Sequence, residues 1–315
     1  MRCVFAGTPD VAAVALGRLL ASSHEVVGVI TRPDAGAGRG RRIVESPVAV
    51  LAAEAGIDVL KPMSMRDPDA LEWLRARQPD VVPIVAFGAL VPPDALVIPP
   101  YGWINLHFSL LPRWRGAAPV QHAIWRGDEV TGASTFLLEE GLDTGPVFGS
   151  VIEEVAPNDT AGMVIARLAE VGADLLIDTL DLIAAGSAAA VAQVGEPTFA
   201  PKVTVADAAV RWDTPAFAVD RQVRACTPAP GAWTTVVGER LGLGPVEVLS
   251  GDGERRLAPG EVQVGKRDVI VGTLTEPVRL GVVRPSGKRE MPAADWARGA
   301  RIGTGVVLGA QGGDA

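Results

Sequence analysis

Residues 2–31, RCVFAGTPDVAAVALGRLLASSHEVVGVIT, decide the fold of the N-terminal half. The apolar runs RCVFAG and EVVGVIT predict two buried strands, and the stretch between them repeats apolar residues at helical spacing. In the turn, Thr8 is the expected N-cap, Pro9 suits the first helical position and Asp10 complements the helix dipole. A strand, a helix and a second strand in this order predict an α/β domain, with a parallel sheet that carries helices on both faces.

The same alternation continues to about residue 189. Further strands are expected at DVVPIVAFG (80–88), GWINLHF (102–108) and PVFGSVIEEV (146–155), and further helices at 46–56, 67–78 and 159–186. A proline removes a ladder hydrogen bond from a central strand, so the strand around Pro83 is expected to accommodate a bulge.

From about residue 207 the pattern changes to short apolar runs separated by turn residues. These runs are AWTTVVG, PVEVLSG, GEVQVG, DVIVGT and VRLGVVRP. Short strands at this spacing are typical of a small antiparallel barrel. The stretch before them is small, polar and proline-bearing, which indicates a linker. The predicted organisation is a domain at 1–189, a linker at 190–206 and a second domain at 207–315.

The composition is that of a folded chain with two domains. Its 315 residues are 48% hydrophobic, which is enough for a sizeable core. The two cysteines, Cys3 and Cys226, cannot form a disulfide framework. Neither a signal peptide nor a long uncharged apolar stretch is visible. We therefore expect a cytoplasmic protein that does not enter a membrane.

The net charge of −8 is unevenly distributed. Residues 1–189 hold 14 Lys or Arg against 23 Asp or Glu, whereas residues 255–301 hold 10 against 5. This distribution argues against a general nucleic-acid coat. It leaves two interpretations of the C-terminal part open, namely one polyanion bound on one side, or an ordinary scatter of surface charge.

The stretch INLHFSLLP, 104–112, contains the first candidate catalytic residues. Asn105 and His107 are two apart on an expected strand, so they face the same side, and ligands bind at the carboxyl ends of parallel strands. A carboxamide beside an imidazole suits a reaction in which an oxygen gains negative charge while a proton moves. Asp143, in EEGLDTGPV, is a candidate to orient the imidazole. The alternatives are a polar pair that caps the strand and a simple turn aspartate.

A glycine-rich basic segment, RPDAGAGRGRR at 32–42, contains Arg39, Arg41 and Arg42. The segment does not match the G-x-G-x-x-G pattern of dinucleotide sites. It suits a mobile basic arm that contacts phosphates, and a solvated flexible loop is the alternative. No metal site is expected, because three dispersed histidines and two distant cysteines offer no ligand spacing.

Together these motifs resemble those of the methionyl-tRNA formyltransferases. The resemblance rests on FAGTPD, RPDAGAGRGRR, INLHFSLLPRWRGAAP, GLDTG and TFAPKVTVADAAVRWD. SLLPRWRGAAP combined with GLDTG is specific, whereas either motif alone marks the wider group of enzymes that use formyltetrahydrofolate. The resemblance implies a Rossmann-like N-terminal domain with a mostly parallel sheet, a linker, and an OB-like C-terminal barrel that contacts tRNA.

The resemblance also implies an activity and a set of site residues. The formyl group of 10-formyltetrahydrofolate, a cosubstrate, would pass to the α-amine of methionyl initiator tRNA without a metal, in a protein expected to be a monomer. The implied catalytic residues are Asn105, His107 and Asp143. The implied folate contacts are Ser109, Leu110, Leu111, Pro112, Phe87, Gly88 and Leu90. The implied tRNA contacts are Arg39, Arg41 and Arg42.

Two other functions stay open at this point. The chain could be another formyltetrahydrofolate-dependent formyltransferase or a hydrolase with a small-molecule acceptor, although the basic arm and the barrel argue against a small acceptor. It could also be a non-catalytic protein that binds tRNA or a nucleotide. Within the implied reaction, the sequence leaves open whether His107, Asp143 or a water held by them takes the proton of the amine.

Overall fold

The computed structural model describes residues 1–37, 42–249 and 257–309, and the chain forms two compact units. Unit 1 comprises Met1–Pro119, Val130–Glu154 and Ile165–Ala200, and unit 2 comprises Val120–Glu129, Val155–Val164 and Pro201–Ala315. The chain therefore passes between the units more than once. The domain and linker boundaries expected from the sequence stay a prediction.

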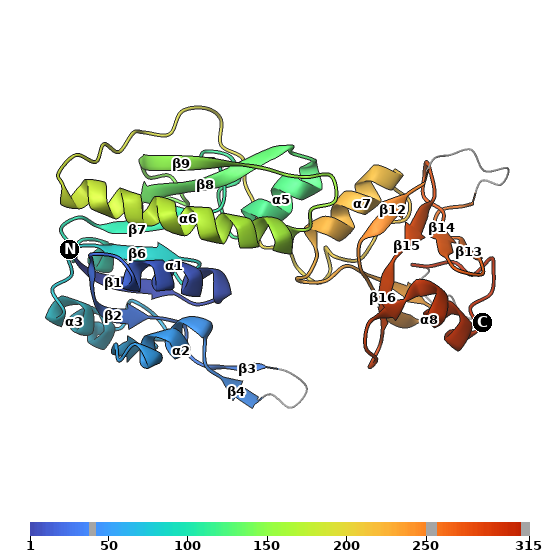
Figure 1. Cartoon of the computed structure of the whole chain (residues 1–315), viewed down its shortest axis with the longest axis horizontal. Helices are drawn as coiled ribbons and strands as arrows, with labels where there is room; N and C mark the ends of the chain where they lie inside the picture. The colour runs from blue at the N-terminus through green and yellow to red at the C-terminus, as the bar shows by residue number, and fades with distance from the viewer. Residues whose placement is uncertain (38–41, 250–256, 310–315) are drawn as a thin grey trace. The chain divides into compact units, whose positions relative to one another are not determined.

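Unit 1 is built on a seven-stranded sheet with the order β5-β2-β1-β6-β7-β8-β9 (Figure 1). Its strands are β1 (Arg2–Gly7), β2 (Glu25–Ile30), β5 (Val59–Leu60), β6 (Val82–Val85), β7 (Trp103–His107), β8 (Val130–Leu137) and β9 (Val147–Glu154). The first five of these pair in parallel, and β8 and β9 are added antiparallel at one edge. The predicted α/β class with a mostly parallel sheet is confirmed.

Helices cover both faces of this sheet. They are α1 (Asp10–Leu20), α2 (Pro47–Glu54), α3 (Pro68–Ala76), α4 (Pro93–Leu96) and α6 (Ala161–Ala184), and the short helix α5 (Pro119–Arg126) precedes β8. On one face, Val4, Ile84 and Trp103 belong to a buried cluster that includes residues of α3 and α4. On the other face α6 runs along β7–β9 (Figure 1), where the hydroxyls of Thr135 and Thr179 are 2.8 Å apart.

The turn between β1 and α1 differs from the prediction. Pro9 occupies the N-cap position, α1 begins at Asp10, and no side chain caps the helix. The hydroxyl of Thr8 donates instead to the carbonyl of Phe87 over 2.9 Å. The prediction of Thr8 as an N-cap is wrong because Pro9 takes that position and the hydroxyl of Thr8 is directed at the end of a neighbouring strand. The bond ties together the carboxyl ends of β1 and β6.

Pro83 lies inside β6 without a bulge in the pairing to β7. On that side the N–H of Val82 donates to the carbonyl of Gly102 over 3.0 Å. Successive residues of a strand direct their N–H groups to alternate sides, so the missing N–H of Pro83 faces β1. The ladder to β1 is interrupted there, because Val81 makes an isolated bridge and pairing resumes only after the proline.

Unit 2 contains two four-stranded antiparallel sheets, with the orders β10-β11-β16-β17 and β12-β15-β14-β13. Their strands are β10 (Trp233–Val236), β11 (Glu239–Leu243), β12 (Val246–Val248), β13 (Val262–Val264), β14 (Val269–Val271), β15 (Val278–Leu280), β16 (Val282–Pro285) and β17 (Met291–Pro292). Helices α7 (Ala216–Ala225) and α8 (Ala293–Ala300) flank them in sequence. The predicted antiparallel architecture of the C-terminal part is confirmed.

Two glycines let the chain pass from one sheet of unit 2 to the other. Gly244 separates β11 from β12, and Gly281 separates β15 from β16. A Cβ on Gly244 would lie 2.5 Å from the Cγ2 atom of Val282, and a Cβ on Gly281 would lie 2.9 Å from the carbonyl oxygen of Pro245. Only glycine allows the two crossing segments to approach this closely, and the crossings link the sheets as a small barrel requires.

The two ends of the basic segment that the sequence suggested as a mobile arm are paired strands. β3 (Ala35–Ala37) pairs antiparallel with β4 (Arg42–Val44). At its base the ammonium of Lys61 lies 2.7 Å from carboxylate oxygens of both Asp34 and Glu45, which hold the two ends of the segment together. The hydrogen bonds that the ammonium donates to these carboxylates raise the pKa of Lys61. Arg39 and Arg41 lie outside the described residues.

Candidate functional site

The candidate site lies where β6 and β7 end. These strands are parallel, and Ile84 pairs with Asn105, so the loops that follow both strands lie beside each other. Asn105 and His107 alternate along β7 with Leu106, whose side chain points toward α6 at Gly172. The two polar side chains therefore share the face of the sheet opposite α6, as the spacing predicted.

The imidazole of His107 is held by a backbone carbonyl. Its Nε2 atom lies 2.9 Å from the carbonyl oxygen of Trp114. A carbonyl oxygen only accepts, so Nε2 carries the hydrogen, and in the neutral ring Nδ1 is left without one. The ring also meets Phe136 edge to face, with centroids 6.4 Å apart. Both contacts fix the plane of the ring and direct Nδ1 to one side.

Asp143 lies on that side. Its Oδ2 atom is 3.8 Å from Nδ1 of His107, and the two side chains are only 12% and 7% exposed. The same Oδ2 accepts a hydrogen bond from the N–H of Gly116 over 2.7 Å. The carboxylate is thus within ion-pair distance of the ring without a direct hydrogen bond to it. Asp143 adopts a φ of 50°, a left-handed conformation that non-glycine residues rarely take.

The electrostatics of the pair favour a neutral imidazole that can accept a proton. Burial lowers the pKa of His107, whereas the charge of Asp143 and the hydrogen bond to Trp114 act in the opposite direction. A buried neutral ring with an unprotonated Nδ1 can take up a proton, and the adjacent carboxylate stabilises the imidazolium that forms. The arrangement suits general acid–base chemistry.

The residues predicted to contact folate fall into two groups. Gly88 and Leu90 are exposed in the loop after β6, and Leu110, Leu111 and Pro112 are half-buried in the loop after β7. Phe87 and Ser109 are buried, at 2% and 0% exposed. The hydroxyl of Ser109 donates to the carbonyl of Arg113 over 2.5 Å, so its visible role is to close its own loop.

Four residues that the sequence did not single out hold the site in place. Trp114 and Gly116 supply the backbone carbonyl and N–H that contact His107 and Asp143. The N–H of Trp114 donates to the hydroxyl of Thr198 over 2.9 Å. The carboxamide of Gln193 donates to the carbonyl of Asp143 over 2.8 Å. A polar side chain within the apolar and small residues of 188–195 is the signal that could have drawn attention to Gln193.

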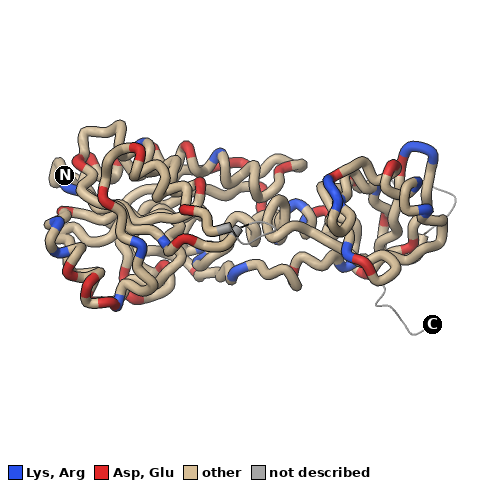
Figure 2. The backbone as a smooth tube through the Cα atoms, turned by 90° about the horizontal axis from the view of Figure 1, so that it is seen from below, with Lys and Arg blue, Asp and Glu red and all other residues tan. Residues whose placement is uncertain are grey.

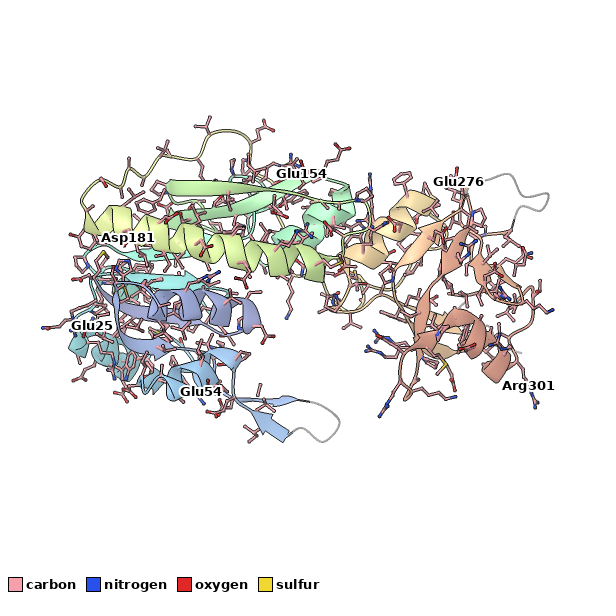
Figure 3. The ribbon with its side chains drawn as sticks, viewed as in Figure 1. Glu25, Glu54, Glu154, Asp181, Glu276 and Arg301 are labelled. Carbon is pink, nitrogen blue, oxygen red and sulfur yellow. The ribbon has the colours of Figure 1, made fainter. Side chains whose placement is uncertain are left out.

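Four other acidic side chains of unit 1 contrast with Asp143. Glu25, Glu54, Glu154 and Asp181 are exposed, and Figure 3 shows them at the periphery of the unit. Figure 2 shows Lys and Arg interspersed with Asp and Glu along both units. Several basic residues of the 255–301 stretch are in ion pairs, namely Arg279 with Glu247, Arg284 with Glu290, and Arg298 with Asp295.

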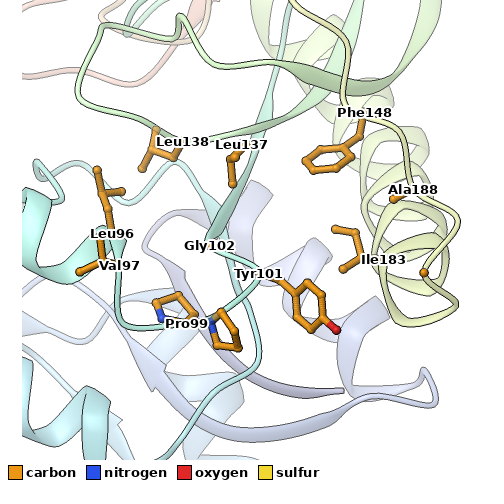
Figure 4. Close-up of a pocket in the computed structure, with 12 residues that line it drawn as sticks. Leu96, Val97, Pro99, Tyr101, Gly102, Leu137, Leu138, Phe148, Ile183 and Ala188 are labelled. Carbon is orange, nitrogen blue, oxygen red and sulfur yellow. The ribbon is translucent and has the colours of Figure 1, made fainter.

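One cavity of unit 1 is separate from this site. It has a volume of about 550 Å³ and lies near the amino end of β7, whereas His107 is at the carboxyl end (Figure 4). Its walls include Leu96, Leu137 and Phe148, and Tyr101 provides the only polar side chain among its lining residues. The cavity therefore has no pair of groups for acid–base chemistry.

Among the residues that the structure describes, no group of three His, Cys, Asp or Glu side chains is placed to hold a metal ion. In the same residues, no helix has the length and apolar character needed to span a bilayer.

Comparison with known proteins finds formyl transferases along most of the chain. The family model for "Formyl transferase" matches residues 1–180, and that for "Formyl transferase, C-terminal domain" matches residues 202–301. A methionyl-tRNA formyltransferase from a Nocardioides species is 61% identical over 310 residues, which cover 98% of each chain. The same enzyme from Salinispora tropica is 60% identical over 309 residues, covering 98% of this chain and all of that one (100%).

A solved structure with the same fold is that of HypX from Aquifex aeolicus in complex with tetrahydrofolic acid. It superposes with a TM-score of 0.67 at 19% identity and covers 96% of this chain. The chain spans about half the length of that protein, 48%. At this level of identity the likeness concerns the fold.

Proposed function

The chain belongs to the methionyl-tRNA formyltransferase family, and we infer that it transfers the formyl group of 10-formyltetrahydrofolate to the α-amine of methionine on initiator tRNA. Relatives of that name are about 60% identical over nearly the whole chain, and their similarity includes both domains. The structural observation that carries the inference is the buried pair of His107 and Asp143 at the carboxyl ends of β6 and β7.

We propose that the reaction proceeds by attack of the amine on the formyl carbonyl carbon. A C–N bond forms to the amine, and the carbonyl oxygen becomes an oxyanion in the tetrahedral intermediate. The C–N10 bond of the folate then breaks, and the proton lost by the amine ends on N10. No electrons are gained or lost, so the reaction needs no redox partner.

Within this scheme Asn105 is the donor to the oxyanion. One such donor is typically worth about 3–4 kcal/mol of transition-state stabilisation. His107 accepts the amine proton at Nδ1, because Nε2 already donates to the carbonyl of Trp114. The resulting N–H faces Asp143, whose charge stabilises the imidazolium. A positioned base of this kind contributes roughly 10²–10⁴-fold in rate.

The binding of the two substrates is also part of the proposal. The loops at 86–92 and 108–113 follow the strands that hold the catalytic residues, so they are placed to line the folate pocket. The segment with Arg39, Arg41 and Arg42 is proposed to contact tRNA phosphates, and on either side of it Asp34 and Glu45 are both bridged by Lys61. Cytoplasmic location and a monomeric state remain proposals.

A comparison of acceptors tests the function. Formyl transfer from 10-formyltetrahydrofolate is measured with methionyl initiator tRNA, with methionyl elongator tRNA, and with glycinamide ribonucleotide or an amino sugar nucleotide. We expect the highest kcat/KM with the initiator tRNA. Faster turnover of a small amine would instead favour the alternative, a formyltransferase with a small-molecule acceptor, and hydrolysis of the donor without any transfer would indicate a hydrolase.

A further inference from the structure

Gln193 stands out in the segment that follows α6. Within residues 189–197, Gln193 is half-buried and all the remaining residues are exposed. Two residues earlier, Val191 forms an isolated β-bridge to Val147, with both N–H···O distances at 2.8 Å. This bridge brings the segment alongside the turn that contains Asp143 and leaves the carboxamide of Gln193 directed at it.

The carboxamide uses both of its ends. Its Nε2 group donates to the carbonyl oxygens of Asp143 and Gly145, each over 2.8 Å. Its Oε1 atom accepts from the guanidinium of Arg115, at 2.6 Å from Nη2 and 3.2 Å from Nε. One side chain therefore links the turn of Asp143 to the residue that precedes Gly116. Gly116 in turn holds the carboxylate of Asp143 through its N–H.

We propose that Gln193 is a positioning residue for formyl transfer, which keeps the carboxylate of Asp143 facing Nδ1 of His107. The inference rests on the proposed function. Asp143 is held in a left-handed conformation, at a φ of 50°, which residues other than glycine rarely adopt. The two hydrogen bonds from Gln193 hold the backbone carbonyls of this turn and so support that conformation.

The link to Arg115 completes the argument. The carboxylate faces the ring only if its own backbone and the N–H of Gly116 keep their relative positions. Gln193 bonds to both segments of this arrangement at once, the turn of Asp143 and the loop of Arg115, and forms no hydrogen bond with His107. We therefore expect its loss to slow the chemical step while the affinity for both substrates is retained, since a small misplacement of a catalytic group is enough to lower the rate.

Two substitutions separate the contacts. Gln193→Glu keeps the length and the acceptor for Arg115 but removes both donors to the turn. Gln193→Met keeps the length and removes every polar contact. Val194→Ala is the matched control, because Val194 is the next residue and is 85% exposed. We expect kcat to fall roughly 10- to 100-fold in both Gln193 variants, with KM for each substrate within about twofold of the unsubstituted enzyme, and no change in the control.

A double substitution distinguishes positioning from general stability. If Gln193 acts through Asp143, adding Gln193→Met to Asp143→Asn should lower kcat no further, whereas independent effects would multiply. Full additivity of the two effects would overturn the proposal, and so would a kcat within about twofold of the unsubstituted enzyme in a folded Gln193→Glu variant. Absence of transfer by the unsubstituted chain would overturn the proposed function instead. Thermal unfolding of each variant verifies that it is folded.

Discussion

The substitution Asp143→Asn tests the electrostatic part of the proposed reaction. Asparagine has nearly the same shape, and its amide oxygen can still accept from the N–H of Gly116, so the turn is expected to keep its conformation. What changes is the charge: a negative group 3.8 Å from Nδ1 of His107 is replaced by a neutral one. The imidazolium that forms during transfer then has no charged partner.

The size of the effect follows from that distance. Two unit charges 3.8 Å apart attract each other by about 4 kcal/mol at an effective dielectric constant of about 20. The two side chains are only 7% and 12% exposed, so water screens this attraction little. With a factor of ten in rate for about each 1.4 kcal/mol, full proton transfer in the transition state predicts a fall in kcat of roughly 10³-fold. Partial transfer predicts a fall nearer 10²-fold.

The assay is formyl transfer to methionyl initiator tRNA at saturating concentrations of both substrates. Glu54→Gln is the matched control, because it also removes one carboxylate, from an exposed position on α2. We expect KM for both substrates to be unchanged in both variants and kcat to fall only in Asp143→Asn. A folded Asp143→Asn variant that keeps kcat within tenfold would refute the reasoning, and catalysis would then depend on the oxyanion donor and on proximity.

Three further predictions follow from the same geometry. Burial lowers the pKa of His24 and of His107 below the usual 6.5, so near that pH the unfolded chain binds more protons than the folded chain. The free energy of unfolding should therefore fall on acidification, and His107→Gln should make it depend less on pH in denaturant titrations. Gly116→Ala should lower stability by about 1–3 kcal/mol and also lower kcat, since Gly116 has a φ of 121° and an added Cβ would meet a carbonyl oxygen at 2.7 Å; a thermal midpoint equal to that of the unsubstituted chain would contradict this. Arg41→Ala and Arg42→Ala should each weaken tRNA binding and reduce the dependence of log K on log salt by about one, without changing KM for the formyl donor; an unchanged salt slope would exclude these residues from the phosphate contacts.

Four parallel strands of unit 1, namely β1, β2, β6 and β7, could be predicted because they lie in apolar runs, whereas the two-residue strand β5 was not predicted. The same criterion missed β8, whose sequence VTGASTFL is mostly small and polar although six of its residues are buried. These residues are buried because β8 pairs on both sides, with β7 and with β9. Pairing on two sides depends on the neighbouring strands of the sheet, so the sequence of β8 alone does not indicate it.

The proposed catalytic residues were predictable to different degrees. Asn105 and His107 share a face because they are two apart on one strand, which is local geometry. Asp143 lies far along the chain, so the sequence offered it as a partner of His107 only beside the alternative of a simple turn aspartate, and the resemblance to a family favoured the first. The N-cap prediction for Thr8 failed for a related reason, because its hydroxyl bonds to Phe87, which is distant in sequence. Rules based on neighbouring residues consider only hydrogen-bond partners that are close in sequence. They contain no information about acceptors from other segments.

The atoms that hold the site together were invisible for a more general reason. Trp114 and Gly116 act through a carbonyl and an N–H, groups that almost every residue has, so their identities do not report these roles. These two residues instead determine the path of the backbone, since Gly116 has a φ of 121° and Trp114 has a φ of 58°. Together with Asp143, at a φ of 50°, these two residues place three positive φ angles around the ring of His107, where carbonyl and N–H groups must point at side chains rather than along a strand. We therefore expect the backbone conformation of the loop after β7 to affect activity as the three proposed catalytic side chains do.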